Sequence, residues 1–273
     1  MHNTQRIATF NIHKGVTHFN ARFSLHHQRE LLRKLHADVV FLQEVRDEHS
    51  EHRKRFSGWP DSGQMEFLAD AIWADYAYGK NSVYPTGHHG NALLSKFPII
   101  QTTNTDISAH ATEDRGMLHS VIDIPQWDQP LHAICVHLGL FARWRRQQLL
   151  MVTDYINSHV PADAPLIVAG DFNDWGMRSG KIFAENSQLH EVFERHAGRP
   201  ARSYPFFFNV FWMSEIFTPR SARIERVSMA TAGVGIGPSS NTYKPTELNP
   251  PPIALSIMKP ERRESLPNPT RWR

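Results

Sequence analysis

The sequence predicts an α/β fold in which mixed β-sheets and helices pack as a sandwich. Residues 6–11, 25–35 and 37–42 read as a strand, a helix with an apolar side and a second buried strand, which together form a β-α-β unit. Residues 91–95, 117–124 and 131–138 read as strands separated by turns with Pro or Gly, which favours antiparallel pairing. Both kinds of pairing together indicate a mixed sandwich rather than a doubly wound parallel sheet.

The other elements follow from hydrophobic spacing. Ser24 is placed to cap the first helix, and residues 66–73 indicate another helix. Residues 142–157 carry apolar side chains at helical spacing, and residues 165–170 form a buried strand that ends at Asp171. Polar side chains therefore stand repeatedly at predicted strand ends.

Composition excludes a disordered, fibrous or membrane-spanning chain. Of 273 residues, 40% are hydrophobic and 21% charged. No apolar run approaches the roughly 18 residues that cross a bilayer. The single cysteine, Cys135, cannot form an internal disulfide, and the first twenty residues show no signal-peptide pattern. We therefore expect a cytoplasmic enzyme, and a monomer.

The end of the chain differs in composition from the rest. All 17 histidines and every aspartate lie at or before His196, whereas residues 197–273 carry 11 Lys and Arg against 5 Glu. We expect a domain at 1–227 and a Pro-, Gly- and Arg-rich tail at 228–273 that is poorly ordered. Because the basic pI owes much to this tail, it is weak support for nucleic-acid binding.

Two motifs offer carboxylates for phosphate chemistry. Glu44 follows a buried run, and with the amide oxygen of Asn11 it suits Mg²⁺, which takes one or two protein carboxylates and keeps several waters. Asp171 and Asn173 follow a later strand; the first can deprotonate a water and the second can donate its amide to a phosphate oxygen. The alternatives are a Glu44–Arg46 pair and a local Asx-turn at Asp171.

Further candidates lie along predicted strands. His137 continues an apolar strand, where an imidazole can contact phosphate, although a lone histidine there is more often a satisfied core residue. Asn91 and Arg115 stand at predicted strand starts, and Arg115 can bind phosphate through two parallel hydrogen bonds.

These pieces together resemble the endonuclease/exonuclease/phosphatase superfamily, which has the DNase I-like fold. The resemblance rests on five ordered motifs, which are residues 9–15 (TFNIHKG), 42–45 (LQEV), 90–95 (GNALLS), 136–138 (VHL) and 170–173 (GDFN). It implies a four-layer α/β sandwich with two mixed, mainly antiparallel sheets, and a Mg²⁺- or Mn²⁺-dependent phosphoesterase. It further implies that Glu44 and Asn11 hold the metal, that Asp171, Asn173 and His137 are catalytic, and that Asn91, Arg115 and His13 bind a phosphate-ester or nucleic-acid substrate.

The chain departs from the superfamily pattern near its end. Where members carry an Asp-Arg-Ile-like strand and then Ser-Asp-His, this chain has residues 213–217 (MSEIF) and a faint echo at 239–241 (SSN). The departure predicts that the last strands are lost and that hydrolysis is impaired. A non-catalytic relic that binds phosphate or nucleic acid is the alternative function. A structural zinc site is disfavoured, because the histidine pairs at 26–27 and 88–89 lack the spaced Cys/His pattern.

Overall fold

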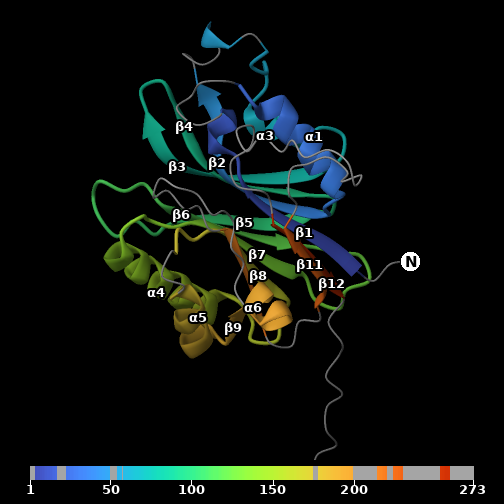
Figure 1. The fold of residues 1–273 in the computed structure, drawn as a ribbon, viewed down its shortest axis with the longest axis vertical. Coiled ribbons are helices and arrows are strands. Elements are labelled where there is room, and N and C mark those ends of the chain that lie inside the picture. The colour runs from blue at the N-terminus through green and yellow to red at the C-terminus, as the bar shows by residue number, and fades with distance from the viewer. Residues whose placement is uncertain are drawn as a thin grey trace, which may run out of the picture.

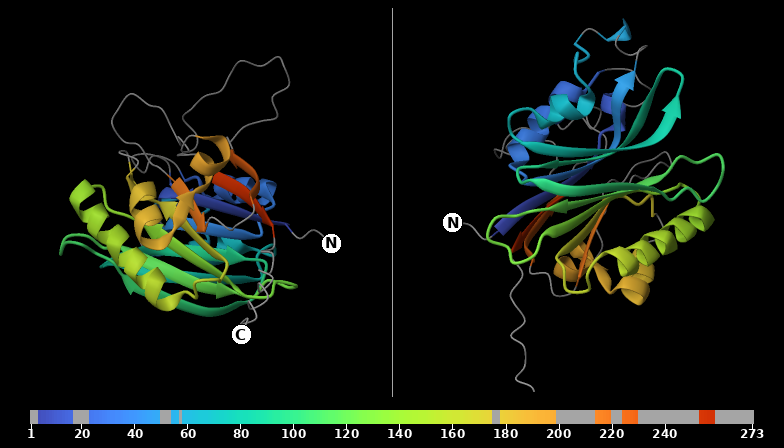
Figure 2. Two further views of the ribbon diagram at one scale, coloured as in Figure 1. Left: turned by 90° about the horizontal axis from the view of Figure 1, so that it is seen from below. Right: turned by 180° about the vertical axis from the view of Figure 1, so that it is seen from behind.

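The computed structural model describes residues 4–16, 23–49, 54–56, 58–174, 178–198, 214–219, 224–229 and 253–258. Two six-stranded sheets pack face to face, and helices cover the outer face of each (Figure 1). The views in Figure 2 show the same four layers from two other sides. The predicted four-layer α/β sandwich with mixed sheets is therefore confirmed.

The first sheet has the strand order β11-β12-β1-β2-β4-β3. Its strands are β1 (Thr4–Asn11), β2 (Val39–His49), β3 (Asp75–Tyr84), β4 (Gly87–Ser95), β11 (Ile224–Met229) and β12 (Ile253–Met258). β1 and β2 are parallel and are connected through the 3-10 helix η1 (His13–Gly15) and α1 (Leu25–Leu35), as the β-α-β prediction requires. α1 and α3 (Gln64–Ala69) pack on the outer face of this sheet (Figure 1).

The second sheet has the order β5-β6-β7-β8-β10-β9. Its strands are β5 (Ile99–Asp106), β6 (Gly116–Ile122), β7 (Leu131–His137), β8 (Leu166–Asp171), β9 (Leu189–Glu191) and β10 (Ser214–Pro219). β7 and β8 are its parallel pair, joined by α4 (Ala142–His159). α4, α5 (Ser179–Ser187) and α6 (Val192–Ala197) lie on the side away from the first sheet (Figure 1).

The core between the sheets is apolar and continuous. Phe41 and Leu93 of the first sheet share one cluster of buried side chains with Leu118, Ala133 and other residues of the second. Burial of apolar surface on this scale is the main force that holds the two sheets together. It also fixes the ends of β1, β2, β7 and β8 relative to one another.

Several details of the predicted elements differ in the structure. α1 begins directly after Ser24, as predicted, but the Ser24 side chain makes no capping hydrogen bond. α3 ends at Ala69 because Asp70 has a positive φ. β2 runs on past Glu44, which was predicted to end it, and Asn91 lies inside β4 rather than at a strand start. The register shift between Leu42 and Val45 marks an irregularity that the hydrophobic pattern does not reveal.

The end of the chain holds a strand, contrary to the prediction that the last strands are lost. β12 pairs antiparallel with β1, from Thr4 opposite Met258 to Thr9 opposite Ile253, and also pairs with β11. A domain boundary at 227 would leave this strand outside the sheet that it completes. The sequence of this strand, IALSIM, is mostly apolar, although its Pro-rich flanks mask the pattern. The other residues beyond 229 lie outside the described part of the chain.

Within the residues that the structure describes, no helix has the length and apolarity needed to cross a membrane.

Candidate active site

Four strand segments from both sheets bring polar side chains to one place. Asn11 is the last residue of β1, His137 the last of β7 and Asp171 the last of β8. Glu44 lies in β2 with φ +55°, within the irregular part of its pairing with β4. The carboxyl ends of the two parallel pairs therefore meet, which is where open α/β sheets place their ligands.

Asn11 joins the two carboxylates. Its Nδ2 donates to Glu44 Oε1 at 3.2 Å and to Asp171 Oδ2 at 2.9 Å, while its Oδ1 accepts the His13 N–H at 3.0 Å. All of Asn11 is buried. The structure thus turns the amide nitrogen toward the carboxylates, so Asn11 positions Glu44 and Asp171 rather than presenting the oxygen that was predicted to ligate metal.

Glu44 is the more readily ionised of the two carboxyls. Burial raises its pKa, but electrostatic interactions with His137, His13 and Lys14, together with the hydrogen bond from Asn11, outweigh burial and lower the pKa to about 2. Lys14 Nζ lies 3.8 Å from Glu44 Oε2. Glu44 is therefore a carboxylate throughout the physiological range, as a metal ligand must be.

Asp171 is fully buried, and burial raises its pKa to about 7, against the hydrogen bonds from Asn11 and from the backbone of Asn173. Asn173 has φ +49°, and its N–H donates to Asp171 Oδ1 at 3.1 Å. The predicted Asx-turn at Asp171 is therefore present. It does not exclude a role for Asp171 in the site that it forms with Glu44, because the same carboxylate also accepts a hydrogen bond from Asn11. The Asn173 amide nitrogen donates to Leu138 O at 2.9 Å, whereas its Oδ1 is buried without a hydrogen-bond partner among the described residues.

His137 lies between the two carboxylates. Its Nε2 is 4.0 Å from Glu44 Oε1 and 4.0 Å from Asp171 Oδ2. Burial, followed by the charge of Arg115, holds the pKa of His137 well below its usual value. The imidazole is therefore neutral at pH 7, and its ring N–H can donate to an oxygen without adding a charge.

The three predicted substrate-binding residues lie on segments next to this centre. Asn91 is buried and donates Nδ2 to Gly116 O at 2.8 Å and to Cys135 O at 3.3 Å, and its Oδ1 has no hydrogen-bond partner among the described residues. Arg115, just before β6, acts electrostatically on His137 and Asp171. His13 contributes to the low pKa of Glu44 from the first turn after β1.

Several residues of the site were not singled out from the sequence. Lys14 has φ +60° in η1, and this conformation accompanies its approach to Glu44. Burial, followed by the charge of Lys14, lowers the pKa of His89 to about 4, which places His89 within the same electrostatic environment. Both residues belong to motifs that the sequence displays, but only the folded chain shows that they face Glu44.

A second network supports the loop after His137. Arg145 is buried in α4 and donates Nη1 to Gly139 O at 3.2 Å and to Leu140 O at 3.0 Å. Arg145 Nη2 lies 3.7 Å from Asp174, whose Oδ2 accepts from the Ser179 N–H and hydroxyl. This network ties the loop after β7 to the loop after β8 and so fixes the mutual position of His137 and Asp171.

The donor set suits a hard divalent cation that keeps most of its own water. The described residues contain no group of three or more His, Cys, Asp or Glu arranged to hold a metal. Mg²⁺ needs only one or two protein carboxylates, and Glu44 is ionised and slightly exposed beside Asp171. The buried Oδ1 atoms of Asn91 and Asn173, which have no partner within the described structure, are further acceptors for metal-bound or substrate hydroxyls.

The divergent segment near the end of the chain reaches this site as well. β10 pairs antiparallel with β8, and Ser214 stands opposite Asp171. This is the strand on which the superfamily resemblance expects an aspartate.

Cys135 is an unsuitable nucleophile, because burial raises the pKa of its thiol to about 12.

Comparisons with known proteins agree with this architecture. The model of the Endonuclease/Exonuclease/phosphatase family matches residues 8–224. The chain is 43% identical over 217 residues to "Uncharacterized protein YbhP" of Escherichia coli (strain K12), covering 80% of this chain and 85% of that protein.

Solved structures share the fold at low sequence identity. The endonuclease/exonuclease/phosphatase from Beutenbergia cavernae is 16% identical with a TM-score of 0.71, covering 94% of this chain and 72% of that one. The human Nocturnin catalytic domain, with a bound sulfate, is 16% identical with a TM-score of 0.65 and 93% coverage of both chains. The mannosyl-6-phosphatase Bt3783 of Bacteroides thetaiotaomicron is 15% identical with a TM-score of 0.67, covering 93% of this chain and 99% of that one. On the family match and the YbhP identity, the chain belongs to the endonuclease/exonuclease/phosphatase family.

Proposed function

We propose that this chain is a divalent-metal-dependent phosphoesterase that hydrolyses a phosphate ester with water as the nucleophile. The observation that carries the proposal is the Asn11 amide, which holds Glu44 and Asp171 together while His137 lies 4.0 Å from both. Two buried carboxylates in this arrangement are costly to fold without a cation or a proton between them. Such a cost is typical of a functional site.

Glu44 is the residue that would hold Mg²⁺ or Mn²⁺. When bound, the cation supplies positive charge to the phosphate oxygens and lowers the pKa of bound water. Asp171 is placed to accept a proton from the attacking water, because its backbone and amide hydrogen bonds fix its two oxygens.

The hydrogen-bond donors of the site are placed to bind the phosphate. The neutral ring N–H of His137 and the guanidinium of Arg115 stabilise the charge that develops on the phosphate oxygens. Asn173 was predicted to donate its amide to the phosphate; one amide hydrogen is directed to Leu138 O, which leaves the other for a phosphate oxygen. Its buried Oδ1 suits the attacking water as a hydrogen-bond acceptor.

Turnover is expected to be slow. After His196 the sequence contains neither His nor Asp, so the residue types that fill the acid–base role in the superfamily pattern are missing there. Loss of a general acid–base group typically costs about 10²–10⁴-fold in rate. The same observation favours a second candidate, a phosphate- or nucleic-acid-binding protein of this fold that has lost catalysis.

The test is hydrolysis of p-nitrophenyl phosphate and bis-p-nitrophenyl phosphate with Mg²⁺, with Mn²⁺ and with EDTA. We expect hydrolysis only with a metal, and Glu44→Gln should require at least tenfold more metal, because one ligand charge is lost. Glu66→Gln removes an exposed carboxylate of α3 and is the matched control.

Full hydrolysis in EDTA, or an unchanged metal requirement in Glu44→Gln, would refute the metal-dependent mechanism. Binding of inorganic phosphate without hydrolysis of either ester would support the second candidate instead.

A further inference from the structure

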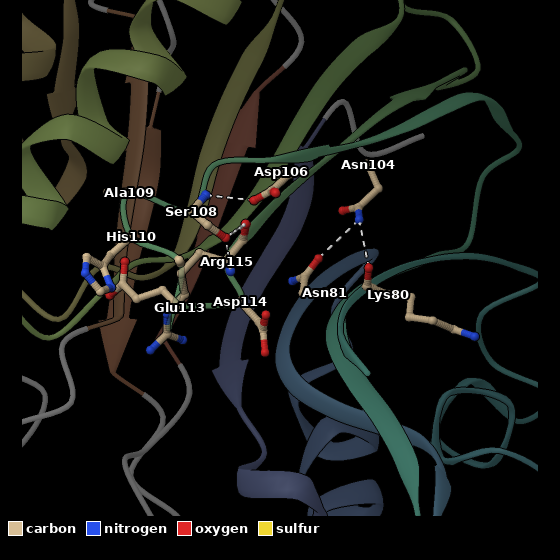
Figure 3. Close-up of a pocket in the computed structure, with 11 residues that line it drawn as sticks. Lys80, Asn81, Asn104, Asp106, Ser108, Ala109, His110, Glu113, Asp114 and Arg115 are labelled. Atoms are coloured by element: carbon tan, nitrogen blue, oxygen red, sulfur yellow. Dashed lines mark hydrogen bonds between the residues drawn. The ribbon is translucent and has the colours of Figure 1, made fainter. Parts of the chain in front are cut away.

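A groove of about 630 Å³ lies beside the proposed active site. It is lined by the β3 residues Lys80 and Asn81, by Asn104 and Asp106 at the end of β5, and by the loop that leads from β5 to Arg115. Figure 3 shows His110 and Lys80 at opposite ends, with Asp114 and Arg115 between them. The groove therefore follows the edge where β3 of the first sheet meets β5 of the second.

The groove and the active site share their boundary. Arg115 lines the groove and also acts electrostatically on His137 and Asp171. Asn91 pairs with Gly79, the residue before Lys80, and its amide donates to the carbonyl of Gly116, the residue after Arg115. A phosphate held by Arg115 thus has the remainder of its molecule directed along this groove.

The groove is strongly polar, and its carboxylates outnumber its cations. Asp106, Glu113 and Asp114 line it against Lys80 and Arg115. Hydrogen bonds hold each carboxylate in place, because Asp106 accepts from Ser108 N, Glu113 from Gln148 and Asp114 from the Ser82 hydroxyl.

This lining discriminates between classes of leaving group. A nucleic-acid strand would bring its neighbouring phosphates against fixed carboxylates, whereas strand-binding grooves are positively charged. Hydroxyl groups, in contrast, donate hydrogen bonds to carboxylates and accept them from the amide nitrogen of Asn81, whose Oδ1 accepts a hydrogen bond from Asn104. A binding site gains specificity from fixed charges that reject one class of ligand as well as from favourable contacts with another class.

We propose that this groove binds the leaving group of the substrate and that this group is a neutral polyhydroxylated one, a sugar or polyol, so that the preferred substrate is a sugar or polyol phosphate. The assignment rests on the proposed phosphoesterase function of the adjoining site. Arg115 then binds the phosphate at the boundary, and the acidic part of the groove binds the hydroxyls.

The experiment measures binding and hydrolysis separately. Calorimetry at physiological salt with Mg²⁺ compares glucose 6-phosphate, a thymidine pentanucleotide and inorganic phosphate on the full chain. The test variant is the double substitution Asp106→Asn, Asp114→Asn. The control is Asp154→Asn, Asp163→Asn, which removes the same charge from exposed positions outside the groove.

We expect glucose 6-phosphate to bind at least tenfold more tightly than the pentanucleotide. The groove variant should strengthen pentanucleotide binding at least fivefold and leave glucose 6-phosphate binding unchanged or weaker, while the control variant keeps the wild-type ratio. Equal or tighter binding of the pentanucleotide would overturn the proposal. The proposal would also be overturned if the groove variant left the ratio of the affinities for glucose 6-phosphate and the pentanucleotide unchanged. It would likewise be overturned if glucose 6-phosphate bound no more tightly than inorganic phosphate.

Hydrolysis of p-nitrophenyl phosphate distinguishes the two proposals. If it is hydrolysed with metal but the binding ratio fails, only the groove assignment is wrong. If neither this ester nor bis-p-nitrophenyl phosphate is hydrolysed, the phosphoesterase function is wrong whatever the groove binds.

Discussion

The bridging amide of Asn11 can be tested by Asn11→Asp, which changes one nitrogen to oxygen. The new carboxylate still accepts the His13 N–H, so that hydrogen bond is retained. Two donors to Glu44 and Asp171, now at 3.2 and 2.9 Å, are replaced by an acceptor of like charge. Hydrogen bonds to charged groups contribute about 1.5–3 kcal/mol each. We therefore expect the free energy of unfolding to fall by about 3–6 kcal/mol in EDTA, out of about 5–15 kcal/mol for a typical domain.

A divalent cation should reverse part of this loss, because three adjoining carboxylates form a stronger metal site than two. Mg²⁺ at a hundred times its Kd would restore about 2.7 kcal/mol. The assay is urea denaturation followed by tryptophan fluorescence, with EDTA and with Mg²⁺. The control is Asn157→Asp, since Asn157 is exposed on α4 and donates its side-chain amide to Asn186 O at 2.9 Å, away from the site.

Two results would refute the reasoning about Asn11. If Asn11→Asp is as stable as the wild type in EDTA, its amide does not hold the carboxylates together. If Mg²⁺ stabilises Asn11→Asp no more than Asn157→Asp, the three carboxylates do not form a metal site.

Two predictions concern stability away from the site. Burial, with the charges of His132 and His159, lowers the pKa of His119 to about 4. The unfolded chain therefore takes up more protons between about pH 4 and 6.5, so the free energy of unfolding should decrease by about 1–2 kcal/mol as pH falls through this window, allowing for solvent screening. Urea titrations of His119→Gln should show a shallower dependence on pH, and an unchanged slope would contradict the prediction. Ending the chain at residue 250 removes β12 from β1. At about 1 kcal/mol for each ladder hydrogen bond, the truncated chain should lose several kcal/mol, and an unchanged melting temperature would show that β12 is dispensable.

The sequence determined the combination of β-α-β and antiparallel strand patterns, and through it the kind of fold. Alternating buried and exposed positions are local properties, so β1, α1, α4 and β8 could be predicted to within a few residues. The short motifs likewise indicated which residues meet, because a polar side chain directly after a buried strand lies at the edge of the sheet, next to the ends of the neighbouring strands. Asn11, Asp171 and His137 are of this kind.

The tertiary structure decided what each polar atom contacts. Asn11 turns its amide nitrogen toward Glu44, where its oxygen was expected to face a metal. Asn173 directs an amide hydrogen to Leu138 O, whereas its amide was expected to donate to a phosphate. In both cases the neighbouring carbonyls and carboxylates fix the orientation of the amide. Glu44 lies within β2 at φ +55°, at the point where the register between β2 and β4 shifts.

The end of the chain shows most clearly what sequence alone could not provide. Its six-residue strand is too short and too closely flanked by prolines to stand out, and it is stable only because β1 and β11 offer hydrogen-bonding edges on either side. Pairing of residues more than 240 positions apart depends on the whole sandwich being assembled, and no local pattern encodes that.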